Sequence, residues 1–590
     1  MSPIVGWGIA VFLLTVAVFA VSLGGGFSNW DDETNVLANP MLHPPSWRNF
    51  GYAWGASYEA LYIPVLYSAY MVEMLAGGGS AIAFHAVNMV LHAASAVMVF
   101  FLIRAILPSS SDVGRWRDPA AAVGALIFGL HPLQVEPVAW VTGQKDVLSG
   151  FLALAAVCLY LLWRQRGGRI HYVAALVLFV LSTLTKPAAV AVPLALLLLD
   201  VVWLSNPWRR VLVALIPWFV VASAVVVVTA LVQTPSPTLK PALGPVWSRP
   251  FVAADALVFY IRRILLPIDL APVYGRTPVV VLAGWWNYLA LPAVLVAAIL
   301  LLRRGGTALI ASGWFVVFFL PVLGLVPFGF QKYSTVADRY AYLSMAGIGL
   351  AVAWGLTVRP SRPVIWGIMI AILMVFAGLS VRQQLLWRDS AALWSHNLAI
   401  APESAVVHAQ YGNACTSAGQ AAQAEQHLRE ALRLAPDEPY FHNNLASLLV
   451  ADGRVDEAVE HFLRAAECDP RYASPHYNLG QIYKRKGLAA EAEREYRAAI
   501  AAKPYYYEAR LNLGALLLEK GDLPGAEAET REALRLNPSA MAARRNLAGI
   551  LAKQGRLNEA AEELHTMLAR NPGDAESAAM LRQIEGALRP

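Results

Sequence analysis

Residues 4–33 read IVGWGIAVFLLTVAVFAVSLGGGFSNWDDE. The run Ile4–Leu23 is apolar and about as long as a helix that crosses the hydrocarbon core of a membrane. Three adjacent carboxylates, Asp31, Asp32 and Glu33, follow it closely. Burying an ionised carboxylate costs several kcal/mol unless it is paired, so such a triplet lies in water or in a functional site. We therefore predict a membrane protein whose first polar loop carries either a solvated acidic turn or a site.

The composition supports a membrane class. The chain has 590 residues, of which 57% are hydrophobic and only 15% charged, whereas soluble chains carry about 25% charge. The first run lacks a basic leading segment and a clear cleavage site, which predicts a retained helix rather than a removed signal peptide. Three cysteines (Cys158, Cys415 and Cys468) are too few for a disulfide framework. The net charge of +6 comes without a basic run, so no nucleic-acid partner is expected.

Up to Val381 the apolar runs recur, which predicts an all-α helix bundle of about eleven spans. Basic residues flank these runs, and such residues usually mark the cytoplasmic side. A cytoplasmic amino terminus places the five basic loops inside if the amphipathic segment Phe251–Pro267 does not cross. The protein is then expected in the inner or plasma membrane, if bacterial, with the first polar loop and the carboxyl-terminal half on the outer, periplasmic side. The expected spans are about 4–23, 81–107, 119–130, 147–163, 172–185, 188–204, 211–231, 279–302, 309–328, 340–358 and 364–381, and the basic loops are Arg104–Arg117, Arg164–Arg169, Arg209–Arg210, Arg303–Arg304 and Arg359–Arg362.

The carboxyl-terminal half is an internal repeat with a period of about 34 residues, which is typical of tetratricopeptide repeats. Small residues recur where two helices of one repeat would pack, and a proline recurs where each second helix ends. We predict residues 1–381 as the membrane domain, 382–404 as a connecting helix, and 405–590 as a soluble α-solenoid of five repeats and a capping helix. Such an array usually binds peptides or proteins; a rigid spacer or a dimerisation surface is the alternative. The recurring prolines are Pro402, Pro436, Pro470, Pro504, Pro538 and Pro572.

Several ionisable residues fall at the outer ends of the expected spans, where an idle charge would be costly. His85 and His92, on one stripe with Asn88, favour a hydrogen-bonded contact between helices over metal ligation. Lys186 lies in an apolar setting, and Arg339 follows Asp338 in an outer loop. Snorkelling to the lipid headgroups is the alternative for each basic residue; for Lys186 and Arg339 we expect a function. Further candidates are His131, Glu136, Lys145 and Asp146.

At this point the residues resemble a known family. An acidic pair directly after the first span resembles the GT-C glycosyltransferases. Five segments are more closely similar to the transmembrane and tetratricopeptide repeat (TMTC) protein O-mannosyltransferases, and the order of membrane half and repeats is the same. Gln144-Lys145-Asp146 departs from the Arg-Ala-Asp usual in that family. The five similar segments are Trp30-Asp31-Asp32, Ala83–His92, Leu130-His131-Pro132 through Glu136 to Asp146, Thr185-Lys186-Pro187 and Ala337–Leu343.

The resemblance implies transfer of a single sugar, mannose, from a polyprenyl-phosphate donor to a Ser or Thr hydroxyl of an acceptor protein, with inversion. Asp31 or Asp32, with Asp32 preferred, would be the general base. Lys186, Arg339 and one of Arg262 and Arg263 would hold the donor phosphate. A lipid phosphate is already a good leaving group, so no metal is obligatory, although a divalent ion remains compatible.

Two other functions compete. An O-antigen-ligase-like oligosaccharyltransferase would also combine many spans with tetratricopeptide repeats, but it relies on a large outer loop late in the membrane half. Here the large polar loop, residues 24–80, is the first one. A non-catalytic scaffold that recruits proteins through the repeats would explain the array but not Asp31, Lys186 or Arg339.

Overall fold

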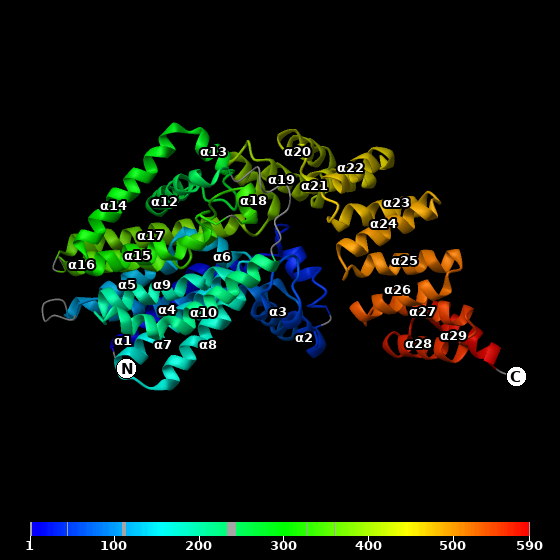
Figure 1. Ribbon diagram of the computed structural model, residues 1–590, viewed down its shortest axis with the longest axis horizontal. Helices are drawn as coiled ribbons and strands as arrows, with labels where there is room; N and C mark the ends of the chain where they lie inside the picture. Colours follow the sequence, from blue (N-terminus) through cyan, green and yellow to red (C-terminus); the bar gives the residue numbers. More distant parts are fainter. Residues whose placement is uncertain are drawn as a thin grey trace. The chain divides into compact units, whose positions relative to one another are not determined.

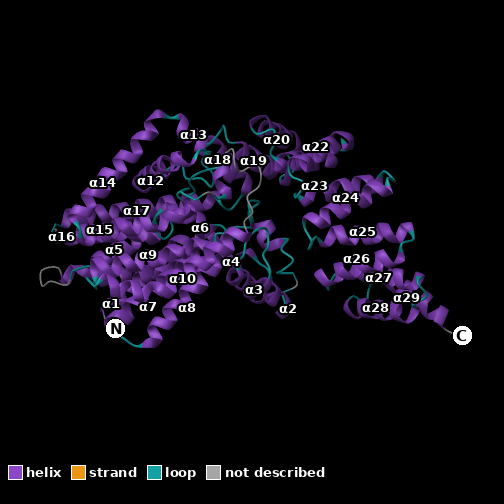
Figure 2. Cartoon of the chain, in the orientation of Figure 1, coloured by secondary structure: helices purple, strands orange, loops and turns teal. Residues whose placement is uncertain are grey.

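The computed structural model describes residues 3–43, 45–108, 114–232, 244–326, 328–358, 360 and 362–588. Across these ranges the chain is helical and contains no β-strand, which confirms the predicted all-α class (Figure 2). The chain divides into two compact units, Met1–Val407 and His408–Pro590. Figure 1 labels the helices of both units. Arg359, part of one expected basic loop, lies outside the described residues.

The first unit is built from long apolar helices joined by short helical turns. Its core is made of Ala, Val, Leu and aromatic side chains from nearly all of these helices. The α-helices are α1 (Pro3–Phe19), α2 (Trp47–Gly55), α3 (Pro64–Gly77), α4 (Ala81–Ile106), α5 (Gly114–Leu130), α6 (Val135–Ala139), α7 (Gln144–Arg166), α8 (Arg169–Thr185), α9 (Val192–Leu198), α10 (Trp208–Val232), α12 (Arg249–Leu265), α13 (Pro278–Ala283), α14 (Ala290–Arg304), α15 (Gly306–Phe319), α16 (Met345–Val358), α17 (Pro363–Leu386) and α18 (Ser390–Ile400). The short turns used below are η2 (Glu33–Leu37), η4 (Pro187–Ala191), η8 (Leu320–Val322) and η10 (Asp338–Ala341).

Several of these helices fit a membrane, so the chain is a multi-pass membrane protein. Within the described ranges, six helices are long and apolar enough to cross, and a bent pair, Gly114–Leu130 with Pro132–Ala139, makes a seventh. Four shorter apolar helices, at 169–185, 187–203, 306–322 and 345–358, coincide with the remaining expected spans. Length and composition alone therefore assign six or seven crossings, and the eleven expected from the sequence require each shorter helix to cross as well. Helix α12 is in neither group.

Small residues bring the helices of this unit close together. Gly124 on α5 and Gly349 on α16 face each other so closely that a Cβ on either would lie within 2.4 Å of the other's carbonyl oxygen. Gly150 on α7 is covered in the same way by the ring of Tyr342. Such close approach is the usual way in which membrane helices gain van der Waals contact.

The second unit is a series of antiparallel helix pairs, as the repeat period predicts. Helices α19–α28 form five pairs that follow one another along the chain, and α29 closes the series (Figure 1). Glycines at the turns between paired helices, such as Gly453 with φ 81°, adopt the left-handed conformation that favours glycine. The helices are α19 (Ala405–Ser417), α20 (Ala421–Leu434), α21 (Pro439–Ala451), α22 (Val455–Cys468), α23 (Ala473–Arg485), α24 (Ala489–Ala502), α25 (Tyr507–Lys520), α26 (Leu523–Leu536), α27 (Met541–Lys553), α28 (Leu557–Arg570) and α29 (Ala575–Leu588).

Candidate functional site

The acidic triplet is held in place from both sides. It follows the first span and leads into η2, which begins at Glu33. Asn29, just before the triplet, is fixed by α18: the indole N–H of Trp394 donates to Asn29 Oδ1 at 3.1 Å, and the Asn29 backbone N–H donates to Ser390 Oγ at 3.2 Å. The rings of Trp30 and Trp394 lie 5.1 Å apart. The expected connecting segment therefore supports the first polar loop through α18.

The two aspartates have different surroundings. The side chain of Asp31 is 43% exposed, and its Oδ2 lies 3.8 Å from Lys145 Nζ. Asp32 is fully buried. Its Oδ2 accepts hydrogen bonds from the backbone N–H of Ser28 at 2.7 Å and from Ser28 Oγ at 3.0 Å. Its Oδ1 accepts from the backbone N–H of Thr142 at 2.9 Å and from Thr142 Oγ1.

These contacts assign the two carboxylates different physical roles. Burial raises the pKa of Asp32 above its ordinary value, although its four hydrogen bonds act in the opposite direction. Both of its oxygens are occupied, and they fasten the first loop to the segment before α7. Asp31 keeps a solvent-facing oxygen beside a lysine. Glu33, in the first turn of η2, is exposed.

Proline breaks place the basic candidates. Because the residue before a proline is forced out of helical geometry, Lys186 is extended (φ −150°, ψ 119°) between α8 and η4. The same effect at His131-Pro132 bends the chain by 51° between α5 and the helical segment Pro132–Ala139, which carries Glu136. Such breaks present side chains and backbone groups at the end of a helix instead of along its side.

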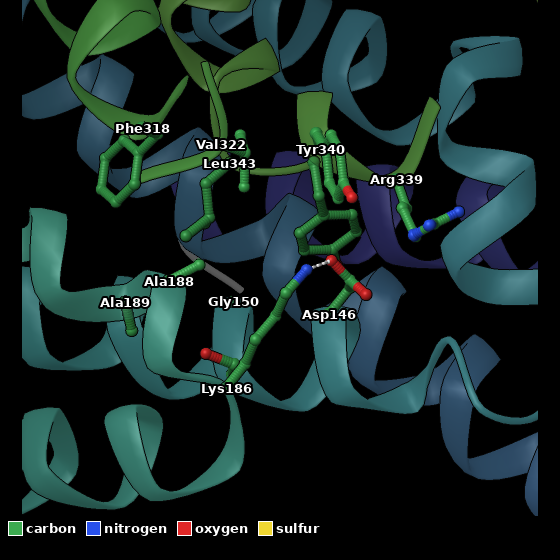
Figure 3. Close-up of a pocket in the computed structure, with 12 residues that line it drawn as sticks. Asp146, Gly150, Lys186, Ala188, Ala189, Phe318, Val322, Arg339, Tyr340 and Leu343 are labelled. Carbon is green, nitrogen blue, oxygen red and sulfur yellow. Dashed lines mark hydrogen bonds and ion pairs between the residues drawn. The ribbon is translucent and has the colours of Figure 1, made fainter. Parts of the chain in front are cut away.

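A pocket lies between the break at Lys186, the start of α7, the end of α15 and η10. Its polar lining includes Lys186, Asp146, Arg339 and Tyr340, and its apolar wall includes Phe318 and Leu343 (Figure 3). Lys186 Nζ forms an ion pair with Asp146 Oδ1, and the same amine lies 5.7 Å from the ring centroid of Tyr340. The pocket thus joins a cationic group to an apolar wall.

A second ion pair holds Arg339, which lines the pocket. The guanidinium of Arg339 binds Glu136 Oε1, and its backbone N–H donates to Glu136 Oε2 at 2.8 Å. Trp140 lies under two cations, with Lys145 Nζ at 4.7 Å and Arg339 Cζ at 5.7 Å from the ring centroid. Lys145 also interacts electrostatically with Asp31, Asp146 and Lys186. Three cations and three carboxylates therefore form one network that connects the acidic loop to the pocket.

The structure places the three histidine candidates outside this network, whereas Asp338 interacts electrostatically with Glu136 and Arg339. His92 bonds with Tyr342 Oη at 3.1 Å and Gly129 O at 3.0 Å, and His85 with Gly26 O at 3.3 Å. His131 bonds with Ile264 O at 3.0 Å, and Asp338 accepts from Tyr274 Oη at 2.7 Å. These four residues hold helices and loops together. Throughout the described part of the chain, no group of three or more His, Cys, Asp or Glu side chains could hold a metal ion.

Arg262 and Arg263 also lie apart from the pocket. They are in the last turn of α12, where Arg262 is exposed. The guanidinium of Arg263 donates to Ile268 O at 2.5 Å and lies 5.0 Å from the ring centroid of Tyr274. Neither arginine lines the pocket that contains Lys186 and Arg339.

Sequence reasoning missed the residues that connect this site to its surroundings. Thr142 holds Asp32, and Tyr340 lines the pocket. Behind the acidic loop, Gln144 Nε2 donates to Glu73 Oε1, and burial raises the pKa of Glu73 to about 8. Thr142 and Gln144 lie within three residues of the candidate Lys145, and this closeness was the one sequence signal for them. Glu73 gave none, because a single glutamate in a polar loop region is normally solvated.

The second unit belongs to a known class of repeat. Models described as TPR repeat and tetratricopeptide repeat match residues 405–438, 446–487, 477–534 and 517–584. Among solved structures, YrrB, a TPR protein with an unusual peptide-binding site, is 19% identical; the match covers 33% of this chain and 99% of that one, with a TM-score of 0.29. The chain is thus a multi-pass membrane protein that carries tetratricopeptide repeats.

Comparison with curated proteins narrows this class. A protein O-mannosyl-transferase of Caenorhabditis elegans is 22% identical over 440 residues, which are 71% of this chain and 61% of that protein. Human TMTC1 is 23% identical over 70% of this chain and 53% of its own length, and Drosophila melanogaster Tmtc2 is 29% identical over 46% of this chain and 31% of its own. The chain is TMTC-like, as its sequence motifs predict, and it spans about a third to three-fifths of the length of these relatives.

Proposed function

We propose that this protein is a membrane glycosyltransferase that moves one mannose from a polyprenyl phosphate to a Ser or Thr hydroxyl of an acceptor protein. The names of its relatives, protein O-mannosyl-transferases, support the reaction class. The observation that carries the proposal is the network that joins a half-exposed carboxylate, Asp31, to a pocket that contains Lys186, Arg339 and an apolar wall. A lipid-phosphate donor needs both a cation and an apolar surface.

In this reaction Asp31, rather than Asp32, is the general base. Asp31 has an accessible oxygen that can take the proton of an acceptor hydroxyl as its oxygen attacks the anomeric carbon. Asp32 has both oxygens occupied and holds the loop. The bond from the anomeric carbon to the phosphate oxygen breaks, and the lipid phosphate leaves with its negative charge. Attack from the face opposite the phosphate inverts the anomeric configuration.

Lys186 and Arg339 stabilise the leaving phosphate. In the structure each is paired with a carboxylate, Asp146 or Glu136, so the network is close to neutral without donor. A phosphate in the pocket would share these cations, while Asp146 and Glu136 fix their positions. No residue of the network needs a metal ion for this step, and a divalent ion is left open as an addition to the donor phosphate.

The experiment is sugar transfer from polyprenyl-phosphate mannose to acceptor proteins by membranes that contain the full chain. We expect Asp31→Asn to lower the transfer rate by about 10²–10⁴-fold, the usual contribution of a general base, at unchanged protein level. Lys186→Met should raise the donor concentration needed for half-maximal rate. Asp269→Asn, an exposed carboxylate outside the network, is the control. Full activity of Asp31→Asn would reject the assignment, and a wild-type chain that is inactive with every polyprenyl-phosphate sugar but still binds proteins would favour the scaffold.

A further inference from the structure

The five repeats share one cross-helix contact whose chemistry changes along the array. A side chain on the first helix of each repeat meets one on the second helix, 19 positions later in the sequence. In the last three repeats the contact joins a basic group to a carboxylate. The three pairs are His476 Nδ1–Glu495 Oε2 at 2.7 Å, Arg510–Glu529 at 2.7 Å and Arg544–Glu563 at 2.6 Å.

In the first two repeats this position holds two histidines instead. His408 Nδ1 lies 3.0 Å from His427 Nδ1, and His442 Nδ1 lies 2.9 Å from His461 Nδ1. In both pairs the ring centroids are 5.2 Å apart and the planes are inclined by 33°. The two pairs therefore repeat one geometry, in which the two Nδ1 atoms face each other at hydrogen-bond distance.

The tautomer of His442 is fixed by its other nitrogen. Nε2 lies 2.8 Å from Pro436 O, and because a carbonyl only accepts, this nitrogen carries the proton. Arg510 and Arg544 donate to Pro504 O and Pro538 O in the same way. The neutral His442 ring therefore directs the lone pair of Nδ1 at His461. A histidine that binds a metal typically donates its second ring N–H to a backbone carbonyl.

The spacing of the two nitrogens fits two ligands of one metal ion. With metal–nitrogen bonds of about 2.0–2.1 Å, a separation of 2.9 Å corresponds to an angle of about 90° at the metal. This is the cis angle of square-planar and tetragonal sites, which Cu²⁺ and Ni²⁺ prefer. Both nitrogens come from packed helices, α21 and α22, so their approach costs little further ordering.

The arginines around the His442–His461 pair are already paired with carboxylates. Arg464 and Asp437 face His442, and Arg429, Glu457 and Glu460 face His461. Arg429 is paired with Glu425 and Glu457, and Arg464 with Asp437 and Glu467. In the metal-free protein His461 Nδ1–H donates to His442 Nδ1, and a bound metal ion would replace this hydrogen bond once His461 carries its proton on Nε2.

We propose that the His442–His461 and His408–His427 pairs each bind one divalent transition-metal ion, with Cu²⁺ preferred over Ni²⁺, through two cis Nδ1 ligands. Solvent fills the remaining coordination positions. The metal clamps the two helices of each of the first two repeats, as the Arg–Glu ion pairs do in the last two.

The test is Cu²⁺ titration of the full chain, purified in detergent without a histidine tag and stripped with a chelator, followed by electron paramagnetic resonance. We expect about two tight equivalents per chain, each with hyperfine splitting from two imidazole nitrogens. His442→Arg/His461→Glu recreates the pair of the last two repeats and should remove one equivalent. His408→Arg/His427→Glu should remove the other.

A matched control and a second variant keep the outcome clear. His476→Arg converts the third repeat to the same Arg–Glu pair without touching either site, and it should keep both equivalents. If the double variant at 442 and 461 folds poorly, His461→Glu alone recreates the His–Glu pair of the third repeat and should weaken copper binding at least tenfold. Equal copper binding by the wild type and these variants, or signals from other histidines only, would overturn the proposal.

Discussion

At the residue scale, two adjacent aspartates of identical chemistry differ in their hydrogen bonds and therefore in their roles. Asp32 accepts four, from Ser28 and Thr142, whereas Asp31 is half-exposed beside Lys145. A buried carboxylate that holds two chain segments together is a structural element, and a neighbour that keeps an accessible oxygen can exchange a proton with substrate. Substitution of Asp32 should therefore change the stability of the protein, and substitution of Asp31 should change the rate of sugar transfer.

We predict that Asp32→Asn destabilises the protein while Asp31→Asn does not. The amide nitrogen of asparagine would face backbone N–H donors that need an acceptor, and a buried group left unsatisfied costs about 1–3 kcal/mol. The measurement is the thermal unfolding midpoint of each full-length variant in detergent. If both variants unfold at the wild-type temperature, the hydrogen bonds of Asp32 do not hold the loop in the way proposed.

Glu73 provides a pH-dependent prediction. Burial raises its pKa to about 8 in the folded protein, above the ordinary value near 4.5, so the folded state binds a proton that the unfolded state releases. Its contribution to the free energy of unfolding therefore falls as the pH rises from about 4.5 to 8 and is constant above that range. Gln144 Oε1 and Glu73 Oε2 are both buried and have no hydrogen-bond partner. Protonation of Glu73 removes the buried negative charge and turns its carboxyl group into a hydrogen-bond donor.

The measurement compares the unfolding midpoint of the wild type and Glu73→Gln between pH 5 and pH 9. The neutral amide removes the titration, so the difference between the two chains should change in favour of the variant as the pH rises. A difference that stays constant over this range would show that Glu73 is already ionised in the folded protein. Because stability is the readout, the result does not depend on the proposed reaction.

At the scale of elements, the bundle depends on helices that touch through glycine. A methyl group on Gly349 would meet the carbonyl oxygen of Gly124 at 2.3 Å, so α5 and α16 would have to separate. Proline breaks act at the same scale, because they place Lys186 and Glu136 at the ends of helices. Packing and breaks together determine where the ion-pair network forms.

We predict that Gly349→Ala lowers the free energy of unfolding by about 1–3 kcal/mol, the usual cost of overpacking a close contact. Gly355→Ala, six residues further along α16, has nothing within 4 Å of its added Cβ and should not lower the stability. The two variants are compared by thermal unfolding and by the amount of protein recovered from membranes. Equal behaviour of the two would mean that α5 and α16 are further apart than described.

At the scale of the whole molecule, the protein combines a membrane helix bundle with a tetratricopeptide array. In the described part of the chain, six or seven helices meet the length and hydropathy of a span, and four shorter apolar helices fill the remaining predicted positions. The basic loops predict the orientation, since Arg and Lys next to spans usually stay on the cytoplasmic side. The first polar loop and the repeats are therefore expected outside.

Cysteine labelling tests this orientation. Cysteines introduced at the exposed Glu33 and Asp456 should react with a membrane-impermeant maleimide in intact cells, and one at the exposed Arg166, at the end of α7, should react only after the membrane is opened. The native cysteines are replaced first. Labelling of position 166 in intact cells would invert the predicted orientation and place the proposed site on the cytoplasmic side.

The sequence alone determined the fold class, because both of its signals are periodic and local. Apolar runs of membrane length predict the spans, and the 34-residue recurrence of Pro, Gly and Ala predicts the helix pairs. It also predicted Asp31, Asp32, Lys186 and Arg339 as site residues, because ionisable groups next to apolar spans are rare. Only the tertiary structure decided which of them meet. Thr142 reaches Asp32 across 110 positions, and Arg339 reaches Glu136 across 203, and no local pattern encodes such contacts. The contact with Thr142 makes Asp32 differ from Asp31. Tertiary packing also leaves Arg262 and Arg263 outside the pocket, because packing, and not residue type, decides which charge stays accessible.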